Sequence, residues 1–391
     1  MNKWDKVRLG DICEKIGSGA TPKGGKEAYC TSGISLIRSQ NVLDYDFSSD
    51  GLAYINSEQA KKLNNVCVKQ DDILLNITGD SVARVCKVDS RFIPARVNQH
   101  VAIIRGKRGM VLNSYILYFL QMIKPNLLML SFGGATRKAL TKQMIEDLPI
   151  CLPDIDEQNK IVRLLDEIQD KIATNTSINK NLEEQAQTIY KSWFVDFEPF
   201  GGEMPMDWRM GIAGEILEFH DAKRVPLSGS EREKMDKIYP YYGATSLMDY
   251  VDNYIFEGIY LLLGEDGTVI TNDGFPVLQY VDGKFWVNNH AHILTGKLGF
   301  SVEELYLLFS LTNIKSIVTG AVQPKVSQMN LKKISVVIPS KELLKEFDDI
   351  IQPMFADIRN RRSESQRLVA LRDTLLPRLM SGEIDVSSIE L

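Results

Sequence analysis

Two stretches of this sequence have residue types and spacings that bear on phosphate or metal chemistry. Residues 20–27, ATPKGGKE, approach a phosphate-binding loop, but Ala20 stands at the first glycine position and Glu27 where Ser or Thr must bind magnesium. Asp273, followed by Asp282-Gly283-Lys284, imitates the acidic residues and lysine of metal-dependent nucleases. We favour a hairpin turn at Asp282-Gly283 instead, because Asp-Gly between two β-branched runs is a strong turn signal.

Metal binding and methyl transfer are also poorly supported. His290 and His292 would share one face of a strand, as two metal ligands do, but only His290 has a counterpart (His100) and no further Cys or His converges on them. Methyl transfer to a base amine needs an Asn/Asp-Pro-Pro-aromatic loop and a Gly-rich cofactor loop, and the sequence has neither. We therefore predict a chain that is not an enzyme and that itself holds no metal or cofactor.

Composition indicates a globular protein with more than one domain. The 391 residues predict roughly two to three domains, and 44% hydrophobic with 25% charged residues is an ordinary globular balance. No apolar run reaches the roughly 18 residues of a membrane span, and the first residues lack a signal-peptide pattern. Five cysteines without CxxC spacing argue against a disulfide scaffold and a structural zinc site, so we expect a cytoplasmic protein.

The net charge of −5 hides an uneven distribution along the chain. Residues 1–150 carry 21 Lys and Arg against 14 Asp and Glu, whereas residues 201–340 carry 12 against 17. The excess of cations in the first segment favours an anionic partner for it.

The chain is a tandem repeat of a β-rich part followed by a long helix. VNQHVAIIRG (residues 97–106) matches VNNHAHILTG (287–296), and β-branched runs such as residues 259–263 and 277–281 predict strands. Short helical stretches interrupt these runs, so the fold class is α+β. We expect two β-rich domains separated by two helices that form an antiparallel coiled coil, related by a pseudo-twofold axis.

Both long helices have clear start signals and apolar seams. Asp154 and Ser340 stand at N-cap positions, and each helix would extend about 40 residues, or roughly 60 Å. The residues expected at the helix–helix interface are Ile161, Leu165, Ile168, Ile172, Leu182 and Ile189 in the first helix, and Phe347, Ile351, Met354, Ile358, Leu368 and Leu375 in the second. Asn175 and Arg361 interrupt the two seams at equivalent positions, where each either fixes the register or is exposed to solvent.

Several stretches resemble one protein family, the specificity (S) subunits of type I restriction–modification enzymes. Residues 17–42, GSGATPKGGKEAYCTSGISLIRSQNV, are similar to the opening of its target-recognition domain, and residues 152–168, LPDIDEQNKIVRLLDEI, to the start of its conserved helix. IYKSWFVDFEPF (189–200) resembles the end of that helix.

The second copy carries the same resemblance. YYGAT (241–245), LLLGEDGT (261–268) and WVNNHAHIL (286–294) are similar to a common variety of recognition domain. LRDTLLPRLMSGEID (371–385) resembles the terminal signature of the second helix, and the resemblance covers nearly the whole chain.

The resemblance implies a division of labour. Two recognition domains, residues 1–152 and 201–339, would each bind one half of a bipartite target on double-stranded DNA. Two helical spacers, residues 153–200 and 340–391, would set the distance between the half-sites and bind two methyltransferase (M) subunits, which carry S-adenosylmethionine. Restriction (R) subunits, which use ATP and magnesium, would join the complex.

The candidate DNA-binding residues are those whose side chains suit phosphates or base edges. In the first domain they are Ser18, Thr21, Lys23, Lys26, Arg38, Ser39, Asn41, Thr78, Arg84, Arg96, Gln99, Arg137 and Lys138. In the second they are Lys223, Arg224, Tyr242, Thr245, Ser246, Asn289, Gln323 and Lys325. For each, the alternative is solvated surface or turn chemistry, and the repeated Asn98/His100 and Asn288/His290 are either structural or base-reading.

Two other classes of function remain as alternatives. A self-sufficient methyltransferase or nuclease would bind its cofactor or metal in isolation. A scaffold held by its coiled coil would have no salt-sensitive affinity for DNA.

Overall fold

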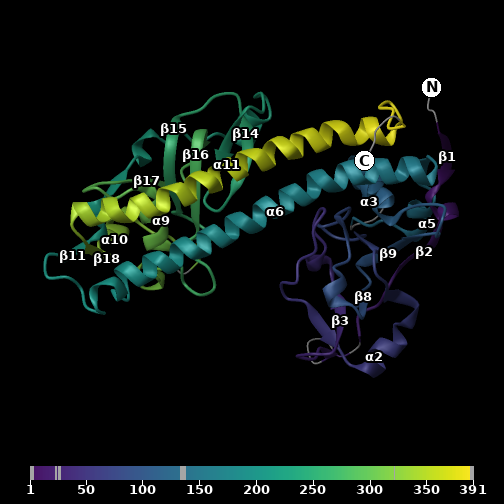
Figure 1. Cartoon of the computed structure of the whole chain (residues 1–391), viewed down its shortest axis with the longest axis horizontal. Helices are drawn as coiled ribbons and strands as arrows, with labels where there is room; N and C mark the ends of the chain where they lie inside the picture. Colours follow the sequence, from purple (N-terminus) through teal and green to yellow (C-terminus); the bar gives the residue numbers. More distant parts are fainter. Residues whose placement is uncertain (1–3, 23, 25–27, 133–137, 321, 388–391) are drawn as a thin grey trace. The chain divides into compact units, whose positions relative to one another are not determined.

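The structure is a computed structural model that describes residues 4–22, 24, 28–132, 138–320 and 322–387 (Figure 1). The chain divides into two compact units, each of mixed helix and sheet. Unit 1 comprises residues 1–173 and 365–391, and unit 2 comprises residues 174–364. Unit 1 is therefore built from both ends of the chain.

Unit 1 contains two four-stranded sheets and a two-stranded ribbon. The strands of the first sheet, in spatial order, are β2 (Cys13–Ser18), β9 (Val101–Gly106), β6 (Ile73–Asn76) and β7 (Val85–Lys87). Those of the second are β4 (Ala53–Ile55), β3 (Ile34–Ile37), β8 (Ala95–Val97) and β5 (Cys67–Val68), and β1 (Asp5–Arg8) pairs with β10 (Pro149–Leu152). Its short helices are α1 (Leu9–Ile12), α2 (Ser57–Lys62), α3 (Asn113–Met122), α4 (Lys124–Ser131) and α5 (Lys142–Glu146), with 3-10 turns η2 (Ser39–Asn41), η3 (Asn64–Val66) and η4 (Ser90–Phe92).

Successive side chains of the central strand β6 pack into two different cores of unit 1. Ile73 and Leu75 of β6 lie in the cluster that contains α3, whereas Leu74 lies in the cluster of the second sheet. Successive side chains of a strand point to opposite faces, so one strand serves both cores when both faces are covered.

Unit 2 repeats this plan with one larger sheet. Its strands, in spatial order, are β12 (Leu217–Phe219), β17 (Ala291–Gly296), β15 (Phe256–Gly264), β16 (Leu278–Val287), β13 (Tyr239–Tyr242) and β14 (Leu247–Val251), and β11 (Arg209–Ile212) pairs with β18 (Ser335–Ile338). Its short helices are α7 (Ala213–Ile216), α8 (Gly229–Arg232), α9 (Val302–Ser310) and α10 (Gln328–Lys332), with 3-10 turns η5 (Glu198–Phe200), η6 (Asp221–Lys223) and η7 (Lys315–Ile317).

The prediction of a hairpin turn at Asp282-Gly283 is wrong. Residues 278–287 form one strand, β16, in which Gly283 pairs with Gly258 of β15. Both glycines have positive φ, +86° and +130°, a backbone conformation that only glycine adopts without strain. The Asp-Gly pair therefore marks an irregularity within a long strand rather than its end.

The long helices α6 (Ile155–Phe194) and α11 (Lys341–Met380) contribute to both units. Each begins at its expected cap: the amide of Glu157 donates to Asp154 Oδ1 (2.8 Å) and that of Leu343 to Ser340 Oγ (3.4 Å). Within unit 2 the helices run antiparallel, since Asn175 contacts Arg361 while Tyr190, further along α6, contacts Phe347.

The seam residues named from the sequence all face inward to some degree. Ile161, Leu165, Asn175, Phe347, Ile351 and Ile358 are buried, and Ile168, Ile172, Leu182, Ile189, Met354, Arg361, Leu368 and Leu375 are partly buried. In unit 1, Ile161 and Leu165 share a core with Leu376 and Leu379. In unit 2, an aromatic cluster around Tyr190, Phe194 and Phe347 joins the helices.

The two polar interruptions of the seam contact each other. Asn175 is completely buried, and its Oδ1 accepts from Arg361 Nη1 (3.3 Å) while its Nδ2 donates to Glu364 (2.8 Å). Asn175 and Arg361 occupy equivalent positions of the repeat, so their contact aligns the two helices at this point. This contact supports the interpretation that Asn175 fixes the helix register.

We predict that Asn175→Leu lowers the unfolding free energy of the chain by about 1–3 kcal/mol, because Arg361 and Glu364 lose a buried partner. Chemical denaturation of the full chain measures this loss. The exposed Asn181→Leu in the same helix is the matched control, and Asn175→Leu/Arg361→Leu should recover part of the loss. If Asn175→Leu is as stable as the control, the buried amide has no register role.

Candidate nucleic-acid interface

In unit 1, four polar residues from three separate segments form one hydrogen-bonded chain. Thr21 donates to Gln99 Oε1, Gln99 Nε2 lies 3.0 Å from His100 Nε2, and His100 Nδ1 lies 2.5 Å from Thr78 Oγ1. Both ring nitrogens of His100 therefore have a polar partner, Gln99 on one side and Thr78 on the other. The loop after β2, the β8–β9 connection and the segment after β6 thus present hydroxyl, amide and imidazole groups together.

In both units the repeated Asn side chain accepts a hydrogen bond from the backbone amide two residues later. Asn98 Oδ1 accepts from the amide of His100 (3.0 Å), and Asn288 Oδ1 accepts from the amide of His290 (2.8 Å). Both Asn side chains are buried at 5% exposure, so neither is available to a partner. Of the two alternatives for these residues, the structural one holds for Asn98 and Asn288.

The two histidines occupy equivalent places in the two units. The carbonyl of His100 accepts from the amide of Ile77, and that of His290 accepts from the amide of Glu265. The next residues, Thr78 and Asp266, therefore correspond. His100 faces a hydroxyl in unit 1, whereas His290 Nδ1 lies 3.7 Å from the carboxylate of Asp266 in unit 2.

Most of the unit 1 candidates are accessible. Exposed or partly exposed are Ser18, Thr21, Arg38, Ser39, Thr78, Arg84, Gln99 and Lys138. Arg38 is held by the carbonyl of Gly51 and lies over the ring of Tyr29. Lys23, Lys26 and Arg137 lie outside the described residues.

Two unit 1 candidates are structural, which corrects the sequence-based set. Arg96 is 7% exposed, and its guanidinium donates to the carbonyls of Ala60 (3.2 Å) and Ala95 (2.9 Å) and to Asn64 (2.9 Å). Asn41 is completely buried and its side-chain amide donates to the carbonyl of Ser48 (3.0 Å). Neither side chain is positioned to reach a ligand.

In unit 2, most candidates are exposed, Tyr242 is partly buried, and Arg224 is held by the fold. Exposed are Lys223, Thr245, Ser246, Asn289, Gln323 and Lys325. The ring of Tyr242 packs on Phe285 in an apolar cluster. The guanidinium of Arg224 is a structural group, because it donates to Glu265 (2.6 Å) and to the carbonyls of Asp221 (3.0 Å) and Ala291 (2.8 Å).

A buried ion cluster beneath these residues was not predicted from the sequence. Asp221 and His292 are 8% and 1% exposed, and His292 Nδ1 lies 2.6 Å from Asp221 Oδ2. Glu265 lies 3.7 Å from the same nitrogen and pairs with Lys325 (3.3 Å). Burial by itself would raise the pKa of Asp221, but the hydrogen bond and charge of His292 hold the pKa below its ordinary value.

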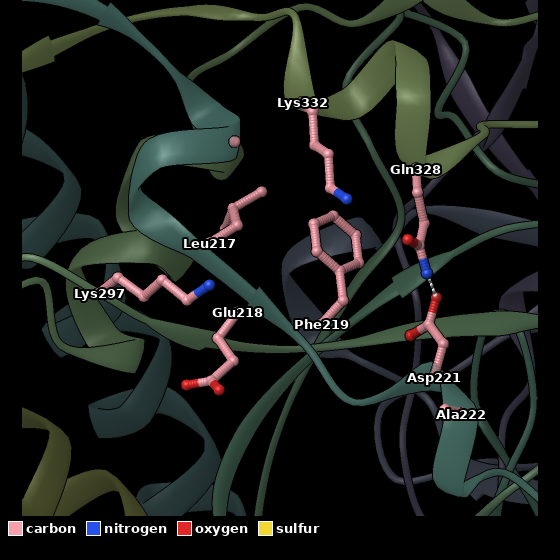
Figure 2. Close-up of a pocket in the computed structure, with 9 residues that line it drawn as sticks. Leu217, Glu218, Phe219, Asp221, Ala222, Lys297, Gln328 and Lys332 are labelled. Carbon is pink, nitrogen blue, oxygen red and sulfur yellow. Dashed lines mark hydrogen bonds between the residues drawn. The ribbon is translucent and has the colours of Figure 1, made fainter.

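The cluster borders a pocket of about 420 Å³ at the edge of the unit 2 sheet (Figure 2). Gln328 of α10 donates to Asp221 at one side of this pocket (2.5 Å), and Lys297, Lys332 and Phe219 line the rest. Lys332 lies over the ring of Phe219 with its ammonium 4.8 Å from the ring centre. The pocket therefore adjoins η6, which carries Lys223.

The ion cluster has the residue types of a metal site but not its free ligand atoms. Asp221, Glu265 and His292 offer ligand atoms within 4.8 Å of one another. Both ring nitrogens of His292 are engaged, however, by Asp221 and by the carbonyl of Val326 (2.8 Å). Arg224 and Lys325 both pair with Glu265, so the group is held by internal ion pairs.

The described helices include none that is both long enough and apolar enough to cross a membrane.

Comparison with known proteins shows the family. A family model described as the type I restriction modification DNA specificity domain matches the chain twice, over residues 1–184 and 205–366. The chain therefore belongs to the family of type I restriction–modification specificity subunits, and the resemblance and the fold class expected from the sequence are confirmed.

Two specificity subunits match this chain over nearly their full length. The chain is 26% identical over 417 residues to the type I restriction enzyme MjaIX specificity subunit of Methanocaldococcus jannaschii, covering 99% of this chain and 94% of that one. It is 22% identical over 471 residues to the HindI specificity subunit of Haemophilus influenzae, with 98% and 100% covered. The S subunit crystal structure from M. genitalium has the same fold, with a TM-score of 0.55 at 16% identity over 97% of this chain and 96% of that one.

We predict that Arg96→Ala lowers the unfolding free energy by about 2–3 kcal/mol, because its hydrogen-bond acceptors lose a charged, buried donor. The exposed Arg84→Ala is the control and should change stability by no more than about 0.5 kcal/mol. Thermal and chemical unfolding of the two variants provide the comparison. Equal stability of the two would mean that Arg96 is not structural.

Proposed function

We propose that this chain is the DNA-reading subunit of a type I restriction–modification complex, in which each unit binds one half of a bipartite target. Membership of the specificity-subunit family supports the role. The observation that supports two different half-sites is a difference beside the equivalent histidines. The neighbour of the histidine is Thr78 in unit 1 and Asp266 in unit 2. One scaffold thus presents different donors and acceptors in its two copies, as two different half-sites require.

The proposed contacts combine phosphate and base recognition. Lysine and hydroxyl side chains suit phosphates, whereas Gln, Asn and Arg suit base edges in the major groove. In unit 1 we retain Ser18, Thr21, Lys23, Lys26, Arg38, Ser39, Thr78, Arg84, Gln99, Arg137 and Lys138. In unit 2 we retain Lys223, Tyr242, Thr245, Ser246, Asn289, Gln323 and Lys325.

The helices take the spacing and assembly roles in this proposal. Residues 1–152 and 201–339 act as recognition domains, and residues 153–200 and 340–391 act as helical spacers that set the distance between half-sites. The spacers bind M subunits, which supply S-adenosylmethionine and the methyl transfer, and R subunits join with ATP. This chain then contributes specificity and no catalytic group. The antiparallel contacts of α6 with α11 support the spacer role.

The proposal predicts a salt-dependent affinity for DNA that depends on the unit 1 face. Lys138→Ala, in complex with the M subunits, should weaken binding and lower the slope of log affinity against log salt by about 1, since one phosphate contact is lost. Lys61→Ala, an exposed lysine of α2 in the same unit, is the matched control and should change neither value. Fluorescence anisotropy over a salt series gives both slopes. Identical slopes for the two variants would contradict the placement of the interface.

The proposal also predicts modular recognition. Replacing residues 1–150 with the corresponding segment of another specificity subunit should change one half of the preferred target and leave the other half unchanged. Selection of bound duplexes from a library with both half-sites randomised reports each half separately. Changes in both halves would contradict the assignment of one half-site to each domain.

A further inference from the structure

We propose that His292 is a buried imidazolium cation that positions the DNA-facing loops of unit 2. The proposal rests on the proposed function for its consequence, the affinity for DNA, but its chemical core can be tested without DNA.

The hydrogen bonds of His292 require two donors. Nδ1 lies 2.6 Å from Asp221 Oδ2, and Nε2 lies 2.8 Å from the carbonyl oxygen of Val326. A carbonyl can only accept, and the two carboxylate oxygens of Asp221 already accept from the amide of Ile293 (2.9 Å) and from Gln328 (2.5 Å). A neutral imidazole has one N–H, so it would leave one nitrogen lone pair facing an acceptor. The doubly protonated ring satisfies both contacts.

The charges around the ring lead to the same protonation state. The carboxylates that face the cluster are Asp221, Glu265 and Asp266, and the permanent cations are Arg224 and Lys325. Arg224 Nη2 lies 3.7 Å from Asp221, and Lys325 lies 3.3 Å from both Glu265 and Asp266. Three carboxylates are balanced only when His292 carries the third positive charge.

His290 is the remaining titratable group at the cluster. It lies 3.7 Å from Asp266 on the outer side, and its side chain is 47% exposed. Solvent screens a charge at that position, so His290 contributes little to the balance around the buried ring. This exposed neighbour on the same segment serves as a matched control.

The ring of His292 joins the loops that carry the proposed contacts. Asp221 begins η6, which includes Lys223, and Val326 directly follows Lys325. Arg224 extends the same network to the carbonyls of Asn289 and Ala291. Removing the charge on His292 would therefore release η6 and the loop before α10 together.

The arrangement is particular to unit 2. In the sheet of unit 1, Leu75 pairs with Ala102, and in unit 2 Leu263 pairs with His292 at the equivalent register. Ala102 is buried in an apolar core and makes no polar contact through its side chain. Loss of the His292 contacts should thus weaken recognition of one half-site only.

The direct test is nitrogen-15 NMR of the full chain labelled at histidine. The chain has four histidines, so the signal absent from the His292→Gln variant is assigned to His292. The proposal predicts two protonated ring nitrogens at pH 7, and a neutral signature in Asp221→Asn, which lacks the carboxylate. A neutral ring in the unaltered chain would overturn the proposal, whether or not the variants fold.

The functional test is the DNA affinity of the complex with its M subunits, measured for each half-site separately. His292→Gln should reduce affinity for the unit 2 half-site about tenfold and leave affinity for the unit 1 half-site unchanged. His290→Gln, which leaves the buried network intact, should have a smaller effect. An unchanged affinity for the unit 2 half-site in His292→Gln would contradict the positioning role. Absence of any DNA binding by the unaltered complex would instead contradict the proposed function and leave the NMR result intact.

Discussion

The antiparallel pairing of α6 with α11 is the constraint on which the rest of the structure depends. Each helix of 40 residues carries an apolar stripe that must be covered, and each covers the other within both units. The same packing closes the globular cores. In unit 1, Leu376, Leu379 and Val386 from the end of the chain share a cluster with Leu9 from its start. Neither globular part is therefore complete without both helices.

A shared scaffold with different polar groups links this architecture to recognition. The buried Asn98 and Asn288 each accept a hydrogen bond from the backbone amide two residues later, so the two units share this local structure. At the surface beside it, Thr78 and Asp266 differ in charge and in hydrogen-bonding capacity. In unit 2, Arg224 pairs with Glu265 and Lys325 pairs with Asp266. The net acidic composition of unit 2 is thus partly neutralised by ion pairs within the unit.

The sequence predicted features that depend on local pattern and missed those that depend on tertiary contact. Helix caps and heptad spacing located the long helices, because both are local signals. The Asp282-Gly283 turn was wrong, because a glycine pair across β15 and β16 accommodates the irregularity inside the sheet. Arg96 lies on β8, where all three residues are buried. The strand therefore has no alternation of buried and exposed side chains from which the burial of Arg96 could be predicted. Asp221 and His292 are 71 residues apart, and no spacing rule connects them.

The central claim is that this chain determines which DNA sequence is methylated. Single-molecule sequencing of genomic DNA tests it most directly, in cells that carry the chain with its M subunit and in cells that carry the M subunit alone. The account predicts a split motif with methyladenine in each half, present only with the chain. Unchanged methylation without the chain, in cells where its complex with the M subunit otherwise assembles, would contradict the account.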